Sequence, residues 1–281
     1  MSRLSGTVRF TGLGNQSLLS STLSKNQNTL SLTLQHYFPL AGTLTWPSNS
    51  PKPVALYKPS DAVSLTVAEF TVEHYFNHIS GDHVREASES RPLVPDLHVN
   101  ETSASIMALQ ITLFPDGGIC DGVTCHHAFL DGKSIAMTPL GSHAVPKPTA
   151  GEFQSKQKVF EHWSETHEPS HTVRGTFQLT LGDIEKLEKR ISNHIKISKL
   201  EYLSSFVVTS ARLWTCIFKA MSSSERKSSM ACFVVGVDYQ ARLGPPTPLN
   251  YFGNCAGSHL GYVQARDCFE EDGLAIVAEK I

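Results

Sequence analysis

Residues 107–132 of the chain read MALQITLFPDGGICDGVTCHHAFLDG. In residues 107–113, apolar side chains alternate with Gln110, Thr112 and an alanine, which is the period of a strand with one buried face. The Pro-Asp-Gly-Gly run that follows is typical of a turn, and residues 119–127 continue as a second strand. The stretch therefore predicts a β-hairpin whose second strand ends at His127.

His127 is followed four positions later by Asp131 and then by Gly132. Histidine has an ordinary pKa of about 6.5, which suits it to remove a proton from a hydroxyl or a thiol near neutral pH. We therefore predict that His127 is a general base. The sequence leaves two roles open for Asp131, which could contact the imidazole or turn away and lock the loop through a cationic partner. Gly132 would provide a close backbone approach or a positive φ where the turn tightens.

Other roles for this segment have less support. A histidine at the end of a strand is most often a structural residue, and the Asp-Gly spacing is what favours catalysis here. A metal site would draw on Cys125, His126, His127 and Asp131, but strand alternation sends the two histidines to opposite faces, and no matching ligand pair occurs elsewhere. The chain also lacks the Gly-x-Ser-x-Gly of serine hydrolases. We therefore expect neither a metal site nor a nucleophilic serine.

The composition is that of an ordinary soluble globular protein, and 281 residues favour about two domains. The net charge of −2 supplies none of the positive field that binding to a nucleic-acid backbone requires. No apolar run approaches the roughly 20 residues of a membrane-spanning helix, and residues 1–19 contain no signal-peptide core. We therefore expect a cytoplasmic protein that binds neither nucleic acid nor a membrane.

Hydrophobic periodicity predicts further elements on both sides of the hairpin. Upstream, we expect a helix over residues 19–34 that ends at the Pro and Gly of residues 39–42, and strands at 43–46 and 54–57, while residues 62–78 fit helix and strand equally. Directly after Gly132, prolines and glycines from 139 to about 170 prevent a stable helix and predict a linker.

A second folded region is expected from residue 172 onwards. Its predicted elements are a strand at 173–181, a helix at 184–191 behind a Thr180/Asp183 capping box, a helix at 203–217 with Phe206 and Leu213 on its apolar face, a buried strand at 232–237 and a helix at 274–281.

The chain resembles the plant BAHD acyltransferases, which use acyl-CoA. The resemblance rests on His126–Gly132, on residues 237–243 (VDYQARL) and on the segment Tyr251-Phe252-Gly253-Asn254-Cys255, with support from residues 37–42 (YFPLAG) and 91–97 (RPLVPDL). Together these motifs are far more specific than His-x-x-x-Asp alone, which chloramphenicol acetyltransferase and condensation domains share. The form of the segment Tyr251–Cys255 is similar to the branch that acylates anthocyanin, flavonoid or phenolic glucosides in plant secondary metabolism.

The resemblance implies an α/β fold of two domains, like that of chloramphenicol acetyltransferase. The N-terminal domain would span residues 1–170 and carry the His-x-x-x-Asp-Gly motif, with the linker starting at about 139, and residues 171–281 would form a partial C-terminal domain. The implied activity is transfer of a malonyl or hydroxycinnamoyl group from its CoA thioester to a hydroxyl of a phenolic or flavonoid glucoside. His127 would be the catalytic base, Asp131 and Gly132 would be structural residues at the active site, and Tyr251–Cys255 would be a signature segment.

The same resemblance implies the partners. Acyl-CoA would be a cosubstrate, no cofactor would stay bound, no metal would be needed, and the protein would be a monomer that meets only its two small-molecule substrates. The motifs do not identify the residues that bind CoA, nor which acyl donor and acceptor are used.

The chain departs from the family pattern at several points. Gln240 replaces the arginine that pairs with Asp131 in the family, so we expect an unpaired carboxylate and a loosened loop. Asp121 occupies a strand position that is apolar in the family, where a buried charge would be costly. The late Asp-Phe-Gly-Trp-Gly motif does not occur, so we expect a truncated chain whose second domain is incomplete and which has little or no activity by itself. The alternative to an enzyme is therefore a catalytically inactive remnant that acts at most as a binding protein.

Overall fold

The computed structural model describes residues 7–12, 16–48, 53–72, 74–115, 117–137, 172–194, 203–221, 230–247 and 251–281. The chain divides into two compact units. Unit 1 comprises Met1–Thr176 and Gln240–Cys255, and unit 2 comprises Phe177–Tyr239 and Ala256–Ile281. The domain boundary at residue 170 stays a prediction, as does the linker, which lies outside the described residues. Gln240–Cys255 belongs with unit 1 although it comes late in the chain.

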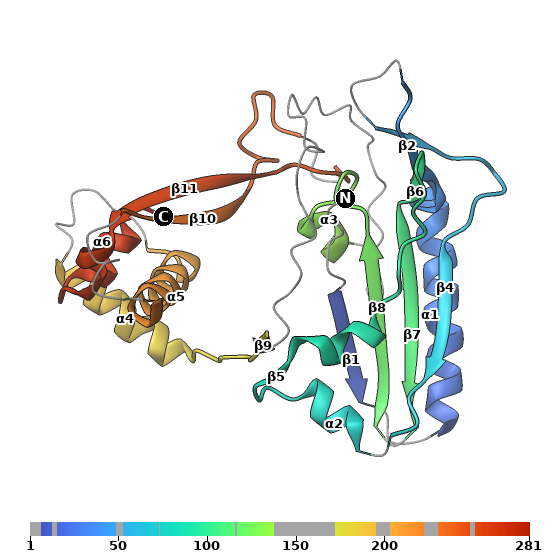
Figure 1. The fold of residues 1–281 in the computed structure, drawn as a ribbon, viewed down its shortest axis with the longest axis horizontal. Coiled ribbons are helices and arrows are strands. Elements are labelled where there is room, and N and C mark those ends of the chain that lie inside the picture. The colour runs from blue at the N-terminus through green and yellow to red at the C-terminus, as the bar shows by residue number, and fades with distance from the viewer. Residues whose placement is uncertain are drawn as a thin grey trace. The chain divides into compact units, whose positions relative to one another are not determined.

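The predicted hairpin lies in the four-stranded sheet of unit 1 (Figure 1). Its strands β7 (Met107–Phe114) and β8 (Gly118–Cys125) pair in antiparallel register from Met107 opposite Cys125 to Phe114 opposite Gly118. β1 (Thr7–Gly12) pairs with β8 in antiparallel fashion, and β4 (Ser64–Glu69) pairs with β7 in parallel. The hairpin prediction is therefore confirmed, and its second strand ends two residues before His127.

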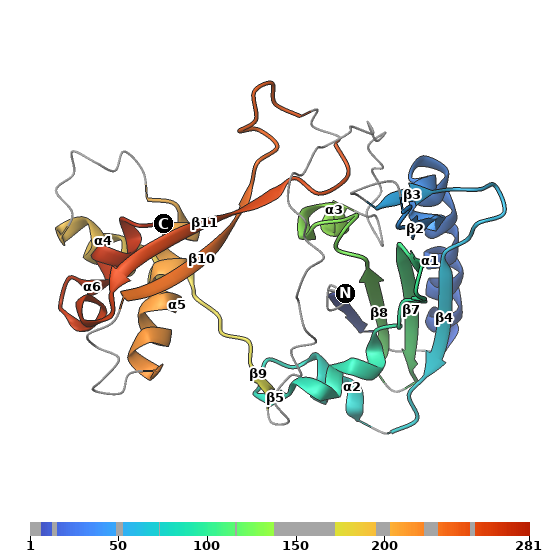
Figure 2. The same ribbon diagram turned by 45° about the horizontal axis from the view of Figure 1, so that its top comes forward.

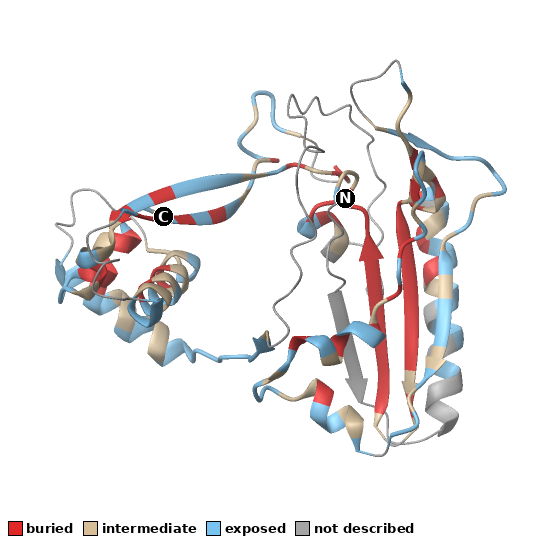
Figure 3. Cartoon of the chain, in the orientation of Figure 1, coloured by how far each residue is buried: buried red, intermediate tan, exposed pale blue. Residues whose placement is uncertain are grey.

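Both faces of the hairpin are buried, so the prediction of a half-buried sheet was wrong (Figure 3). On one face, Leu109 and Val123 pack in a core cluster with Leu30 of helix α1 (Gln16–His36). The opposite face carries polar side chains that bind the backbone of a crossing segment. Gln110 Nε2 donates to the Pro92 carbonyl and Thr124 Oγ1 to the Pro95 carbonyl, both at 2.6 Å.

Gly122 explains how that segment comes so close. A Cβ at this position would lie 1.9 Å from the carbonyl oxygen of Leu93, so only glycine allows the crossing backbone to reach the sheet. Asp121, the neighbouring residue, is buried at 9% exposure, as the sequence led us to expect for its side chain.

The smaller elements of unit 1 follow the sequence closely. Helix α1 covers the predicted helical segment and is followed by the short helix η1 (Phe38–Ala41). The segment that fitted helix and strand equally contains both, because β4 is followed by α2 (Tyr75–Ser80). Further elements are β2 (Thr43–Thr45), β3 (Val54–Leu56) and β6 (Ser103–Ser105), which form one antiparallel sheet, and β5 (Arg85–Glu86), η2 (Ala87–Leu93) and β9 (Val173–Arg174). The predicted strand at 173–181 is wrong beyond Arg174.

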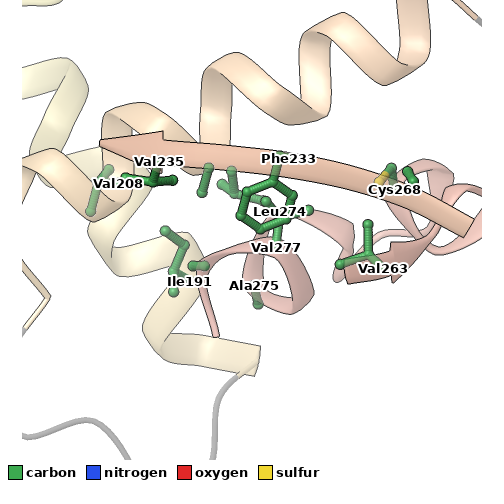
Figure 4. Close-up of a cluster of buried hydrophobic side chains, with 12 residues drawn as sticks. Ile191, Val208, Phe233, Val235, Val263, Cys268, Leu274, Ala275 and Val277 are labelled. Carbon is green, nitrogen blue, oxygen red and sulfur yellow. The ribbon is translucent and has the colours of Figure 1, made fainter. Parts of the chain in front are cut away.

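In the described part of unit 2, three helices and a short turn of helix pack against one face of a two-stranded sheet (Figures 2 and 4). The sheet pairs β10 (Met230–Asp238) with β11 (Ala256–Gln264) in antiparallel register, and the helices are α4 (Leu181–His194), α5 (Ser205–Met221), η4 (Ala265–Phe269) and α6 (Gly273–Ala278). Phe233 lies at the centre of this core with Ile191, Val208 and Leu274 around it (Figure 4). The capping box of α4 is confirmed, since Thr180 Oγ1 accepts from the Asp183 backbone N–H at 3.2 Å and Asp183 Oδ2 accepts from the Thr180 N–H at 3.1 Å.

Two burial predictions in unit 2 were wrong. β10 is buried on one face only, since Phe233 is fully buried and Val234 is 51% exposed. On α5 the buried residues are Val208, Ala211 and Thr215, whereas Phe206 and Leu213 are more than half exposed. Among the described residues, the helices include none with the length and apolar character needed to cross a membrane.

Candidate active site

The two adjacent histidines have opposite environments. His126 is buried, its Nδ1 accepts a hydrogen bond from the Ala128 N–H at 3.1 Å, and its ring centre lies 5.8 Å from that of Trp46. Its carbonyl accepts from the N–H of Phe129 at 2.9 Å, which closes a tight turn. His127 is exposed at the start of this turn, although strand alternation groups it with the buried Val123 and Cys125, because the strand β8 already ends at Cys125. An exposed imidazole held on a tight turn can reach a substrate.

Asp131 is buried and holds the other end of the turn. Its Oδ1 accepts from the backbone N–H of Ser134 at 2.8 Å, and its Oδ2 accepts from the backbone N–H of Cys255 at 2.9 Å. The Ser134 contact is the N-cap of helix α3 (Gly132–Met137), with Asp131 as the capping residue. The expectation of an unpaired carboxylate was therefore wrong, because backbone donors satisfy Asp131.

The local helix and its first glycine also differ from expectation. A helix does form after Asp131, over six residues, before the chain enters the part that is not described. Gly132 is not at a positive φ, and a Cβ there would meet nothing within 4 Å among the described residues. Neither reason that we gave for a glycine at this position holds.

The segment Tyr251–Cys255 binds the turn through three consecutive residues. Gly253 has a φ of 145°, which disfavours any residue with a Cβ, and exchanges two hydrogen bonds with Ser134 Oγ, which donates to its carbonyl at 2.9 Å and accepts from its N–H at 3.1 Å. Asn254 Nδ2 donates to the His127 carbonyl at 2.6 Å, and the Cys255 N–H donates to Asp131. These contacts fix the positions of the turn and of α3 relative to the signature segment.

Aromatic packing against the core of unit 1 also supports the segment Tyr251–Cys255. The Phe252 ring lies 4.4 Å from the ring of Tyr37, which is buried in the same core as Val123 of β8. Burial raises the pKa of Tyr251 above its ordinary value, with smaller contributions from Cys255 and from the negative charge of Asp131. Both tyrosines stay neutral near pH 7, since burial also raises the pKa of Tyr37.

Gln240 has a partner of its own. It is buried, its Oε1 accepts from Lys133 Nζ at 2.6 Å, and its Nε2 points to the Tyr251 carbonyl at 3.5 Å. Gln240 therefore ties the start of α3 to the signature segment by a route that does not use the carboxylate of Asp131.

Metal or thiol chemistry gains no support here. Burial raises the pKa of the Cys125 thiol to about 12, so it is neither a thiolate ligand nor a nucleophile near neutral pH. Within the described ranges, no three His, Cys, Asp or Glu side chains are arranged to hold a metal ion.

Sequence reasoning found His127, Asp131 and the signature segment, and the structure brings them together. It missed Ser134 and Lys133 as the residues that connect α3 to that segment. Ser134 had a detectable signal, since it stands three residues after an aspartate at a helix start, the position whose N–H such a cap binds. Lys133 had none, because its partner lies 107 residues away.

Comparison with known proteins places residues 14–281 in the Transferase family. The chain is 37% identical over 289 residues to the malonyl-CoA:anthocyanidin 5-O-glucoside-6''-O-malonyltransferase of Arabidopsis thaliana, covering 90% of this chain and 62% of that protein. It is 33% identical over 298 residues to phenolic glucoside malonyltransferase 1 of Bemisia tabaci, covering 93% of this chain and 63% of the relative. The chain thus spans less than two thirds of the length of these relatives.

Solved structures show the same fold. Vinorine synthase matches with a TM-score of 0.65 and 17% identity, over 97% of this chain and 65% of that one. The TRI101 protein of F. sporotrichioides, crystallised with coenzyme A and T-2, matches with a TM-score of 0.66 and 11% identity, over 98% of this chain and 68% of that one. The predicted α/β fold, similar to that of chloramphenicol acetyltransferase, is therefore confirmed.

Proposed function

Because the chain belongs to the Transferase family of BAHD acyltransferases, we propose that it transfers a malonyl or hydroxycinnamoyl group from acyl-CoA to a hydroxyl of a phenolic or flavonoid glucoside. The names of the relatives, which include anthocyanin and phenolic glucoside malonyltransferases, favour malonyl as the acyl group. The observation that carries the proposal is the exposed His127 on a turn whose backbone is anchored at both ends.

The proposed reaction needs one base and no covalent enzyme intermediate. His127 removes the proton from the acceptor hydroxyl as its oxygen attacks the thioester carbonyl carbon. A C–O bond forms and a tetrahedral oxyanion results, which collapses as the C–S bond breaks. The imidazolium of His127 then returns its proton to the departing CoA thiolate. Acyl-CoA is thus consumed as a cosubstrate, and the products are the glucoside ester and free CoA.

The other site residues have structural roles in this proposal. Asp131 does not relay charge to His127, because both of its carboxylate oxygens are directed at backbone N–H groups. Asp131 and Tyr251–Cys255 hold the turn, and Gly132 begins the helix that the aspartate caps. We further propose a cytoplasmic monomer whose partners are the two small-molecule substrates.

The test is a transfer assay with malonyl-CoA or a hydroxycinnamoyl-CoA and a panel of phenolic and flavonoid glucosides, with esters detected by mass spectrometry. In contrast to the sequence-based expectation of little or no activity, the proposal requires wild type to form the ester, and His127→Ala should abolish it without loss of folded structure, because this side chain is exposed. His98→Ala, at another exposed histidine, is the matched control and should retain activity. If wild type is folded but forms no ester with any donor, the alternative of an inactive, at most ligand-binding protein holds instead.

A further inference from the structure

We propose that Asn254 is a positioning residue, which holds the backbone of His127 and so sets the place of its imidazole for proton transfer. The inference rests on the proposed role of His127 as a base. Its starting point is the 2.6 Å hydrogen bond from Asn254 Nδ2 to the His127 carbonyl. Because His127 is the exposed first residue of a turn, its side chain has little packing of its own to keep it in place, and the backbone contact supplies that constraint.

Chemistry fixes the orientation of the Asn254 amide. A flipped amide would set Oδ1 against the His127 carbonyl oxygen, so two acceptors would face each other. In the observed orientation Oδ1 is buried and has no hydrogen-bond partner among the described residues. A buried oxygen without a hydrogen bond is unfavourable, and the bond from Nδ2 of the same amide to the His127 carbonyl explains why this orientation is kept.

The neighbours of Asn254 prevent it from simply following His127. Gly253, before it, is bound on both its N–H and its carbonyl by Ser134 Oγ. Cys255, after it, donates its N–H to the buried carboxylate of Asp131. The backbone of Asn254 is therefore held on either side, so its side chain acts as a fixed support for the turn.

The first test does not depend on activity. The chain is labelled with carbonyl-¹³C histidine and ¹⁵N alanine, and only His127-Ala128 and His143-Ala144 give a carbonyl–nitrogen correlation, since these are its two His-Ala pairs. His127→Gln assigns the signals. Asn254→Ala should shift the carbonyl signal of His127 and leave that of His143 in place, and Asn77→Ala, at an exposed asparagine of α2, should shift neither. An unmoved His127 signal in Asn254→Ala overturns the inference.

The second test separates positioning from packing. Asn254→Ala should lower kcat by roughly 10- to 100-fold and change KM for both substrates less than about 2-fold, as expected when a base is displaced by a fraction of an ångström. Asn254→Asp keeps the size of the side chain but replaces the donor with a carboxylate that faces a carbonyl oxygen, so its kcat should fall at least as far. If Asn254→Asp retains wild-type kcat, the amide serves only to fill space, and the inference is wrong.

The two failures can be told apart. A wild-type protein without transferase activity, in which Asn254→Ala still shifts the His127 carbonyl, removes the proposed function and with it the catalytic purpose of the contact. An active wild type in which Asn254→Ala keeps full kcat leaves the function standing and removes the positioning role.

Discussion

Replacing Asp131 tests whether its two backbone contacts stabilise the protein. Each hydrogen bond from a backbone N–H to a buried carboxylate contributes about 1.5–3 kcal/mol to the free energy of unfolding. Asp131→Asn keeps one oxygen as an acceptor and can still cap α3, but its NH₂ group faces the second N–H as donor against donor. We expect this variant to lose about 2–3 kcal/mol, and Asp131→Ala, which loses both contacts and the cap, about 3–5 kcal/mol.

The assay is urea unfolding followed by circular dichroism, with the slope of the transition compared between variants. Asp82→Asn is the matched control, because this aspartate is exposed, and it should change the free energy of unfolding by less than about 0.5 kcal/mol. Equal stability of Asp131→Asn and wild type would refute the reasoning, since it would mean that the carboxylate does not hold both N–H groups. So would an alanine variant no less stable than the asparagine variant.

Three further predictions concern the supports of the site and the second unit. Gly253→Ala should destabilise by about 1–3 kcal/mol, because alanine is strained at a φ of 145° and its Cβ would lie 3.0 Å from Tyr251 Oη; a urea midpoint equal to wild type would contradict this. Gln240→Arg should destabilise by about 2–4 kcal/mol, since the guanidinium would replace the acceptor of the Lys133 ammonium, and adding Lys133→Gln should restore most of the loss if the cause is charge repulsion. The pKa of Asp183 is lowered chiefly by the Thr180 hydroxyl, so the cap of α4 is fully stabilising above the unfolded-state pKa of about 4 and is lost as pH falls through the lower folded-state pKa. Asp183→Asn should therefore remove the pH dependence of the protection of the α4 amides against hydrogen exchange in that range, and an unchanged pH dependence would argue against this role of Asp183.

The hairpin could be predicted because its pattern is local, but its burial could not. Alternation in residues 107–113 correctly predicts a strand, but it also predicts that the face with Gln110 and Thr112 is not buried. Gln110 is buried since its amide reaches the Pro92 carbonyl, a partner 18 residues away that has no side-chain signal in the sequence. For β10 the prediction overestimated burial. A continuous apolar run predicted a strand buried on both faces, and the structure buries one face only.

The candidate site shows a similar division. Residue types and spacing identified His127 and Asp131, because their chemistry resides in their side chains. The partners of Asp131 escaped prediction because they are main-chain N–H groups, which every residue but proline offers. The glutamine at position 240 predicted a loosened loop, while the observed anchor depends on where Cys255 lies in three dimensions.

The contact between Asp131 and Cys255 also orders events in time. The two residues are 124 positions apart, and a ribosome that adds roughly 5–20 residues per second needs about 6–25 s to cover that distance. During this interval the strands β1, β4, β7 and β8 of the four-stranded sheet have already been made, but the turn that carries His127 lacks its anchor. Closing so distant a pair also costs chain entropy before it yields any contact. The nascent chain therefore contains the four-stranded sheet of unit 1 before the candidate site is complete, and the turn gains this anchor only when the signature segment emerges.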